Sequence, residues 1–287
     1  MSAEGRKHLI LTGKNGSGKT STLDALSLYF ERLLPMTEEA HQYQFEHTFD
    51  TPDDDLGSGV IPRLSSGASF QKTVEAGQFV LAYYYATRVS SVEVSKNIER
   101  VDLDMHNPMK SSAGQKLVKY MVNLKTTQAF ALQKGDQKRA VEIEAWFVRF
   151  EGILRTVFDD PELKLDFDID TFAFTILQTG HQPFDFNQMS SGYSAVFAII
   201  NDLLIRMEPQ RRYDLEGVVL IDEIDAHLHL ELQKKILPIL TTLFPRLQFI
   251  VTTHSPFILS SLENSVVFDL ENPTLIENGA FHVDSLP

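Results

Sequence analysis

The 287-residue sequence contains no cysteine, which excludes a disulfide framework and any metal site built on cysteine thiolates. It also lacks an apolar run long enough to span a membrane, because the longest, Ala195–Ile205, is broken by Asn201 and Asp202. Basic residues are scarce, 26 against 39 acidic ones, and the formal charge of −13 argues against a surface that coats nucleic acid. A local basic groove, or contacts made through a partner, stays compatible with this composition. The N-terminus lacks the plan of a signal peptide, so we expect a cytoplasmic protein.

The first distinctive stretch is HLILTGKNGSGKT, His8–Thr20, which has the pattern of a short strand, a glycine-rich loop and a helix start. In the GxxxxGK[ST] pattern, backbone amides surround the phosphates, the lysine reaches the terminal phosphates and the hydroxyl holds Mg²⁺. The helix that follows, expected over 19–34, presents its positive end to the same anion. A glycine-rich turn that binds nothing is the weaker alternative. We therefore predict a site for ATP and Mg²⁺ formed by Gly13, Lys14, Asn15, Gly16, Ser17, Gly18, Lys19, Thr20 and Ser21.

An acidic segment later in the chain supplies the further groups that ATP hydrolysis needs. Val218–Ile221 is a fully apolar run that ends in Asp222 and Glu223. A buried parallel strand delivers the residues at its C-terminal end to the edge of the sheet where ligands bind. Asp222 is therefore predicted to hold Mg²⁺ through water, as the acidic partner of Thr20, and Glu223 to accept a proton from an attacking water. Two solvated acids after a strand are the alternative.

Polar residues also follow a second apolar strand, Phe249–Val251, in the stretch FIVTTHSPF. A histidine at this position, His254, is able to hydrogen-bond a terminal phosphate and to sense its loss. Taken alone, it is more typical of a helix entry, with Ser255 as the cap and Pro256 in the first turn.

Between the glycine-rich loop and the acidic strand lies NQMSSGYSA, Asn187–Ala195, whose small hydroxyl residues and glycine open a helix that we expect to begin near Ser191. The N-terminus of a helix attracts anions, which makes this segment a candidate for a second phosphate contact. On its own, the pattern indicates only a helix cap.

In this order, GKNGSGKT, MSSGY, VVLIDE and TTH resemble the motifs of the ATP-binding-cassette class of P-loop ATPases. The resemblance implies that the MSSGY stretch contacts the γ-phosphate bound by a second subunit, so that two copies enclose ATP head to tail. It implies that Lys19 and Thr20 hold phosphate and metal, that Asp222 holds the metal, and that Glu223 is the base. The remaining roles implied are the contact across the dimer for Ser190, Ser191 and Gly192, the D-loop for Asp225, and the switch histidine for His254.

Other features resemble the non-transporter branch of this class. Transporter subunits usually follow their acidic pair with a proline, whereas this chain has DEIDAHLHLELQ, and about 170 residues separate Lys19 from Ser190. The likeness is to the AAA_21-type, RecF, SMC and OLD families, and above all to predicted ATP-binding proteins of bacterial defence systems such as the Septu and retron-associated ATPases. His227 and His229 belong to that pattern as packing and capping residues. A metal site between them is disfavoured, because residues two apart on a helix diverge.

We expect an α/β fold, a P-loop NTPase parallel sheet flanked by helices, because strands alternate with helices in the last third of the chain. One domain over 1–287 is predicted to comprise a P-loop lobe (1–60), a β-rich insert (61–110), a helical hairpin (111–160) and a lobe with the signature, acidic strand and histidine (161–287). Trp146 lies off the apolar stripe of the hairpin, which makes it a candidate exposed aromatic. Arg88 closes a strand, where it either reaches a phosphate or forms a structural ion pair, and the ion pair is favoured.

Some elements of the ATP-binding-cassette class are not placed. No adenine-stacking aromatic is evident before Gly13, so we expect either that adenine is held differently or that the chain is part of a longer protein. Gln78 comes too early in its strand to serve as the Mg²⁺-sensing glutamine.

The functional hypothesis is an ATPase that dimerises on ATP and acts as a conformational switch on a nuclease or toxin partner in anti-phage defence. A DNA repair or end-binding ATPase is the second hypothesis, and it requires a basic groove near the dimer face. An ATP-binding scaffold with little turnover and, last, a transporter energy subunit are the others.

Overall fold

The computed structural model describes residues 8–31, 73–74, 76–88, 92, 97–99, 101, 103, 107–110 and 112–277. Residues 61–72 of the predicted β-rich insert, and residues 32–34 of the first predicted helix, lie outside these ranges. The helices are α1 (Lys19–Glu31), η2 (Ala113–Lys116), α4 (Leu117–Gln133), α5 (Gln137–Phe158), α6 (Ser191–Met207), η3 (Glu208–Gln210), α7 (Leu230–Leu243) and α8 (Pro256–Leu259). The strands are β1 (His8–Thr12), β2 (Phe79–Tyr84), β3 (Lys164–Phe167), β4 (Phe174–Leu177), β5 (Glu216–Ile221), β6 (Leu247–Thr252), β7 (Ser265–Asp269) and β8 (Thr274–Glu277).

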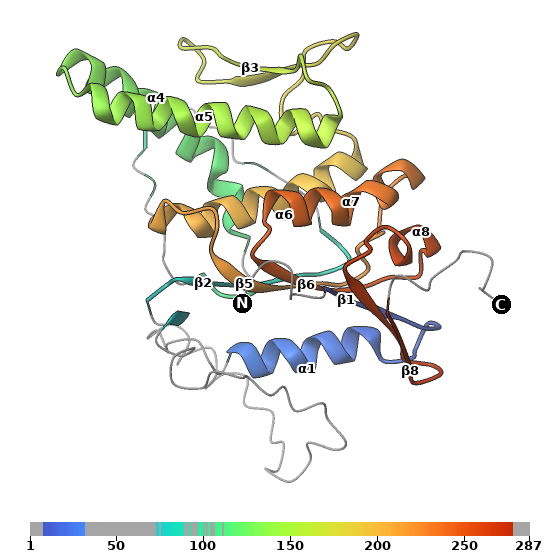
Figure 1. Ribbon diagram of the computed structural model, residues 1–287. Coiled ribbons are helices and arrows are strands. Elements are labelled where there is room, and N and C mark those ends of the chain that lie inside the picture. The colour runs from blue at the N-terminus through green and yellow to red at the C-terminus, as the bar shows by residue number, and fades with distance from the viewer. Residues whose placement is uncertain are drawn as a thin grey trace.

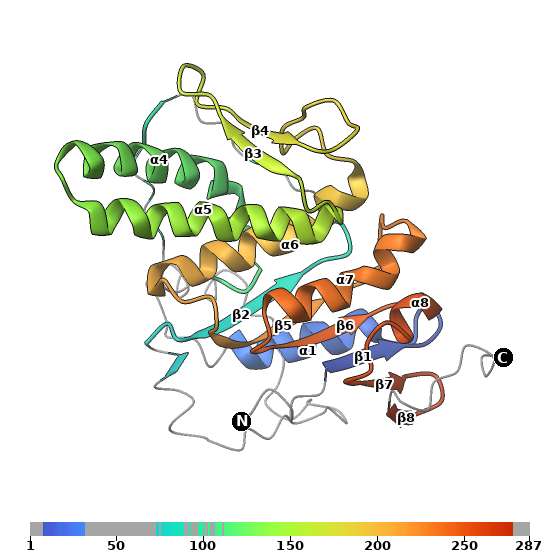
Figure 2. The same ribbon diagram turned by 45° about the horizontal axis from the view of Figure 1, so that its top comes forward.

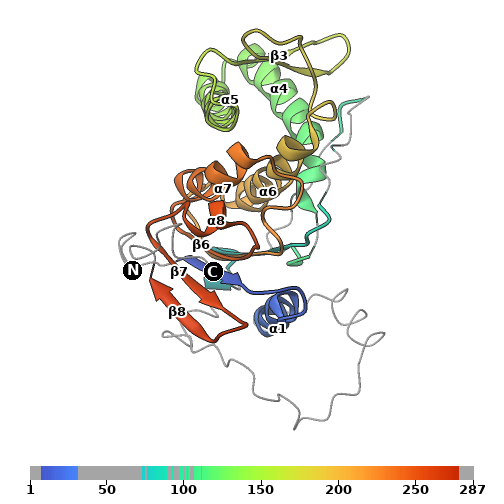
Figure 3. The same cartoon turned by 90° about the vertical axis from the view of Figure 1, so that its right-hand side faces the viewer.

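A six-stranded sheet in the order β2-β5-β6-β1-β7-β8 forms the centre of the described chain. Every neighbouring pair is parallel except β7 and β8. Figures 1 and 3 show α1 on one face of this sheet and α6, α7 and α8 on the other. The predicted α/β fold, a parallel sheet flanked by helices, is confirmed.

The apolar run of β5 is explained by these two helical layers. Val218 and Leu220 belong to the buried cluster on the α1 side, whereas Val219 and Ile221 belong to the larger cluster that includes α6 and α7. Because successive side chains of a strand point to opposite faces, a strand covered on both faces needs apolar residues at every position. The run that predicted a buried strand therefore reflects burial from both sides.

The placement of β2 corrects the sequence-based organisation. We expected its residues in a β-rich insert, 61–110, yet β2 pairs in parallel with β5, from Phe79 opposite Glu216 to Tyr84 opposite Ile221. The small separate β unit is instead the antiparallel pair β3–β4, which lies over the helical hairpin (Figure 2). A strand that joins a sheet at long range carries no local signal of its neighbour, which is why the sequence did not reveal it. The lobe boundaries proposed from the sequence stay a prediction.

The predicted helical hairpin consists of α4 and α5, and it lies outside the α6 layer (Figure 1). The Asp136 carboxylate caps α5 by accepting a hydrogen bond from the backbone N–H of Arg139 at 3.1 Å. The apolar stripe of α5 is buried as predicted, but the expectation that Trp146 is exposed is wrong, since this residue is 8% exposed. Its indole N–H donates to the carboxylate of Glu208, which is itself buried. The helical pattern of apolar residues does not predict such a partner, because a charged residue such as Glu208 is expected to face solvent.

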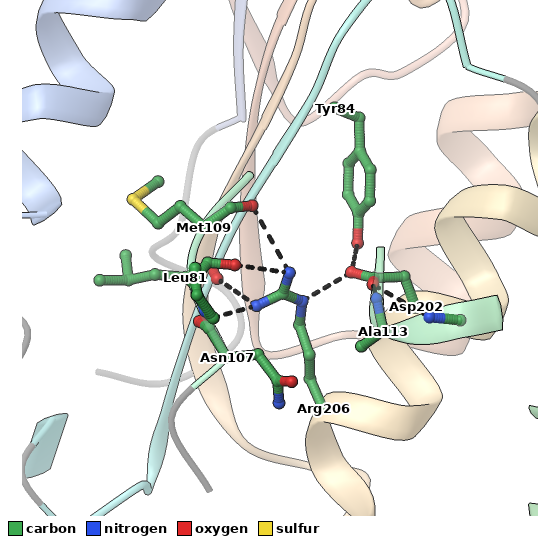
Figure 4. Close-up of polar contacts among 9 residues, drawn as sticks. Leu81, Tyr84, Asn107, Met109, Ala113, Asp202 and Arg206 are labelled. Atoms are coloured by element: carbon green, nitrogen blue, oxygen red, sulfur yellow. Dashed lines mark hydrogen bonds and ion pairs between the residues drawn. The ribbon is translucent and has the colours of Figure 1, made fainter. Parts of the chain in front are cut away.

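A buried ion pair attaches α6 to β2 (Figure 4). Nε of Arg206 donates to Asp202 at 2.6 Å, and the hydroxyl of Tyr84 donates to the same carboxylate at 2.7 Å. The other guanidinium nitrogens donate to backbone carbonyls, among them those of Leu81 and Asn107. Burial lowers the pKa of Arg206, but Asp202 and Tyr84 together outweigh burial, and the net shift of the pKa is upward. The ion pair therefore ties the helix behind MSSGY to the edge strand of the sheet.

Gly217 of β5 is paired with Val80 of β2 and has no room for a Cβ, so Gly217→Ala should destabilise the protein. A Cβ at this position would lie 2.3 Å from the carbonyl oxygen of Val80 and 2.7 Å from Leu247. We expect a loss of about 1–3 kcal/mol in the free energy of unfolding, because the sheet must shift to admit the methyl group. Urea denaturation measures it. The matched control is Gly152→Ala on α5, where a Cβ meets nothing within 4 Å, and it should gain up to about 1 kcal/mol. Equal stability of the two variants would contradict the prediction.

Candidate functional site

The glycine-rich loop between β1 and α1 has the backbone that its sequence predicts. Gly13, Gly16 and Gly18 have φ values of +135°, +84° and +93°, in the region that side-chain-bearing residues rarely adopt. The loop is closed by a hydrogen bond from the N–H of Ser17 to the carbonyl of Lys14 at 3.1 Å. It therefore leads directly into the N-terminus of α1, where backbone N–H groups and the helix dipole favour an anion.

The side chain of Lys19 lies within this loop and is only 7% exposed. Its ammonium donates to the carbonyl oxygens of Gly13 at 2.8 Å and Lys14 at 2.9 Å. The side chain of Lys14, by contrast, is 81% exposed and pairs with Glu271 at 2.5 Å. This hydrogen bond raises the pKa of Lys14. The two lysines of the loop thus differ: one is held inside it and the other is on its outer surface.

The acid after β5 meets the hydroxyl that begins α1, although 202 positions separate them in the sequence. Oγ1 of Thr20 lies 3.0 Å from Oδ2 of Asp222, and Oγ1 of Thr252 donates to the other carboxylate oxygen at 2.6 Å. Asp222 is 5% exposed and Thr252 is fully buried. Mg²⁺ prefers hydroxyl, carboxylate and water oxygens, so these donors fit the metal predicted from the sequence.

Glu223 occupies a turn in an unusual backbone conformation, with φ of +43°. Its backbone N–H donates to Oγ1 of Thr252 at 2.7 Å, while its side chain is exposed. Thr252 therefore connects the carboxylate of Asp222 to the peptide of Glu223. The sequence identified Thr252 only as a polar residue after a strand, and this bridging role was missed.

The residues that follow β6 hold the next part of this turn. The hydroxyl of Thr253 donates to the carboxylate of Asp225 and accepts from the N–H of Ser255 at 2.9 Å. Oγ of Ser255 caps α8 by accepting from the N–H of Phe257 at 3.2 Å, with proline in the first turn, which confirms the predicted helix entry. His254 lies exposed between these two elements, and its contact with a terminal phosphate stays a prediction.

The signature segment begins α6, with Ser190 in the cap position but without a side-chain capping bond. Ser190 and Ser191 are exposed, whereas Gly192 is buried against the turn after β5. A Cβ on Gly192 would lie 3.2 Å from the carbonyl of His227. In the parts of the chain that the structure describes, no hydrogen bond joins the three signature residues to the nucleotide loop. The loop, Asp222 and Glu223 are thus brought together, whereas the signature packs against His227, later in the same turn.

The two histidines of DEIDAHLHLELQ differ in their backbone setting. His227 has a left-handed backbone with φ of +64°, and His229 is in the N-cap position of α7 without a side-chain capping bond. Among the described residues, no three His, Cys, Asp or Glu side chains are grouped so that they could hold a metal ion. Nor does any helix among them combine the length and apolarity needed to cross a bilayer.

The structure contradicts the favoured expectation for Arg88, a structural ion pair. This side chain is 8% exposed, and it pairs with backbone carbonyls rather than with a carboxylate. Its terminal nitrogens donate to the carbonyl oxygens of Asp222 (3.0 Å), Glu223 (3.2 Å), Ile224 (2.8 Å) and Tyr85 (3.1 Å). Burial lowers the pKa of Arg88 to about 10, against the opposing influence of Asp225, Asp222 and Glu223. Every residue has a backbone carbonyl, so the sequence identifies the arginine but not the carbonyl oxygens that it contacts.

Comparison with known proteins agrees with this geometry. Residues 106–260 match the family model AAA_21, described as an AAA domain, putative AbiEii toxin, Type IV TA system. The chain belongs to the AAA_21 family. This confirms the resemblance to AAA_21-type, non-transporter P-loop ATPases that the sequence motifs indicate.

AAA_21 relatives are similar over part of their length. The chain is 42% identical to the Septu protein PtuA of Bacillus mycoides over 101 residues, which are 34% of this chain and 14% of that protein. It is 39% identical to the Retron Ec83 probable ATPase of Escherichia coli over 90 residues, 30% of this chain and 17% of that one. The matches thus span less than a fifth of either relative. A solved SMC head, bound to the C-winged helix domain of ScpA, is similar over 92% of this chain and 86% of its own at 15% identity and a TM-score of 0.47.

Proposed function

We propose that this chain binds ATP with Mg²⁺ and hydrolyses it. The observation that carries the proposal is the meeting of Thr20 with Asp222 at 3.0 Å, beside a glycine loop that buries Lys19. Two hard oxygen donors, a buried ammonium and the N-terminus of α1 are the set that phosphoryl transfer needs, since such catalysis consists mainly of positioning and electrostatics. A solvated acid pair would have no reason to be linked to the loop in this way.

In the proposed reaction each residue has one task. Lys19 and the loop amides orient the terminal phosphates, and Thr20 and Asp222 hold Mg²⁺, which supplies positive charge for the phosphoryl oxygens. The Glu223 carboxylate accepts the proton of the attacking water, and His254 donates a hydrogen bond to the terminal phosphate. Thr252 keeps Asp222 and the peptide of Glu223 in register through its single hydroxyl.

We further propose that the active unit is a head-to-tail dimer in which Ser190, Ser191 and Gly192 of one copy complete the ATP site of the other, with Asp225 at the same interface. The exposure of both serine hydroxyls supports this arrangement. The dimer acts as a switch on an effector, a nuclease or toxin, in prokaryotic anti-phage defence within the cytoplasm. The support for this part is the likeness to proteins named for Septu and retrons.

Ser191→Glu should abolish ATP-dependent dimers without preventing ATP binding. A carboxylate in the first turn of α6 is stabilised by the helix dipole, so the variant should fold. The same negative charge should repel the γ-phosphate of the ATP bound by the partner. Light scattering with and without ATP and Mg²⁺ measures the mass, and the effector should bind only the dimeric form. The control is Gln137→Glu, which also adds a carboxylate at an exposed first position of a helix, at the end of α5 opposite to Phe158 and its contact with Tyr193 of the signature. If the wild type stays a monomer with ATP, or if Ser191→Glu still dimerises, the dimer part of the proposal is wrong.

A further inference from the structure

Arg88 lies at the point where the paired part of the sheet ends. The last backbone hydrogen bond between β2 and β5 runs from the N–H of Asp222 to the carbonyl of Tyr84, at 2.8 Å. Beyond it the chain turns, and the carbonyls of Asp222, Glu223 and Ile224 no longer have a strand to pair with. The carbonyl of Glu223 accepts the N–H of Ala226 at 2.8 Å within the turn, whereas those of Asp222 and Ile224 require donors from elsewhere, because unsatisfied buried polar groups are costly. Arg88 donates to all three carbonyls from one guanidinium.

Thr252 and this guanidinium hold the backbone of Glu223 on its N-terminal and C-terminal sides, in addition to the turn bond from Ala226. Oγ1 of Thr252 accepts the N–H of Glu223 at 2.7 Å, and Nη2 of Arg88 donates to its carbonyl at 3.2 Å. Between these two bonds, Glu223 has the left-handed φ of +43°, which a residue with a side chain adopts only when its surroundings impose it. The planar fork of arginine is suited to this task, since it offers several donors in a fixed geometry, whereas the single ammonium of lysine does not.

Arg88 is itself well anchored. Four residues earlier, the hydroxyl of Tyr84 donates to the buried carboxylate of Asp202, which also pairs with Arg206. The end of β2 is therefore held against α6, which fixes the backbone from which Arg88 extends to the turn. Its Nε is buried and has no hydrogen-bond partner among the described residues. The position of the side chain therefore satisfies the hydrogen bonds of the terminal nitrogens and leaves that of Nε unmade.

We propose that Arg88 is a positioning residue for Glu223: by holding the carbonyls of Asp222, Glu223 and Ile224, it imposes the left-handed turn that directs the Glu223 carboxylate to the attacking water. The inference rests on the proposed hydrolysis of ATP. Arg88 itself contacts neither water nor phosphate in this role. Its loss should therefore affect turnover far more than ATP binding.

The test is Arg88→Lys, followed by hydrogen exchange and by steady-state kinetics. Loss of the fork should free the turn, so that the amides of residues 222–228 exchange at least about tenfold faster while the rest of the chain is unchanged. The kcat should fall by about 10²-fold, since a small misplacement of a reacting group has effects of this size, while ATP affinity changes less than about threefold. The matched control is Arg155→Lys, because Arg155 also donates to a backbone carbonyl, that of Leu163 at 2.9 Å, but in the hairpin.

Unchanged exchange over 222–228 would overturn the proposal, whether or not the wild type hydrolyses ATP. Faster exchange with an unaltered kcat would also overturn it, because Arg88 would then stabilise the turn without positioning the base. A wild type that shows no hydrolysis removes the proposed function, and hydrogen exchange then still decides whether Arg88 holds the turn. If the lysine variant does not fold, Arg88→Gln removes the charge and is too short to reach the three carbonyls, so it should give the same pattern of faster exchange over 222–228.

Discussion

Replacing Lys19 by alanine should abolish ATP binding, with a fall in affinity of at least about 10²-fold, equivalent to about 3 kcal/mol. The ammonium is 7% exposed and is held at the centre of the loop by two carbonyl oxygens, of Gly13 and Lys14. A bound triphosphate would replace these weak neutral acceptors by charged oxygens, and hydrogen bonds between charged partners are about twice as strong as neutral ones. Titration with a fluorescent ATP analogue in the presence of Mg²⁺ measures the change.

The loop offers its own control for this experiment. Lys14, five positions earlier, belongs to the predicted site through its backbone, while its side chain carries the same charge as that of Lys19 but pairs with Glu271 on the outside of the loop. Because exposed ion pairs contribute little, Lys14→Ala should leave ATP affinity within about twofold of the wild type. Equal losses in the two variants would mean that the loop acts only through its general charge, and an unaffected Lys19→Ala would mean that the phosphates bind elsewhere.

Glu223→Gln should reduce ATP hydrolysis by about 10²–10⁴-fold, the range that a positioned general base contributes. The amide has the shape of the carboxylate but cannot accept the proton, and the backbone bond from Glu223 to Thr252 does not involve the side chain. ATP affinity should therefore stay close to that of the wild type, and ATP-dependent dimers should persist and accumulate. Release of phosphate and light scattering measure the two effects in the same sample.

Glu231→Gln is the control for this substitution, since Glu231 is an exposed carboxylate in the first turn of α7 that pairs with Lys234 at 3.4 Å. It should hydrolyse ATP at the wild-type rate. Equally slow hydrolysis by the wild type and Glu223→Gln would support the alternative of an ATP-binding scaffold. Loss of ATP binding in Glu223→Gln would show instead that the turn had been damaged.

The sequence predicted the parts of the molecule whose chemistry is local. The loop glycines have the φ values that only glycine adopts readily, and the apolar runs of β5 and β6 became buried strands that deliver Asp222 and the residues before His254 to one edge. Thr20 and Asp222 are far apart in the chain, but each belongs to a motif whose partner is known from its chemistry, so their contact was also predictable.

What the sequence did not predict depends on long-range partners. Trp146 is buried because Glu208, beyond α6, accepts its N–H, and β2 joins the central sheet because it pairs with a strand more than a hundred residues later. Arg88 was expected to meet an opposite charge, yet it meets carbonyl oxygens, which every residue possesses. Because every residue has a backbone carbonyl, the identities of the residues do not show which carbonyls an arginine will contact.

Gly192 packs the signature segment directly against the turn after β5: its missing Cβ leaves room for the carbonyl of His227 and the side chain of Leu232. The same turn contains Asp225, whose carbonyl accepts the N–H of Leu228 at 3.0 Å. The two segments that one copy would offer to its partner are therefore packed against each other. A displacement of one would carry the other with it, so a second molecule would meet both as a single surface.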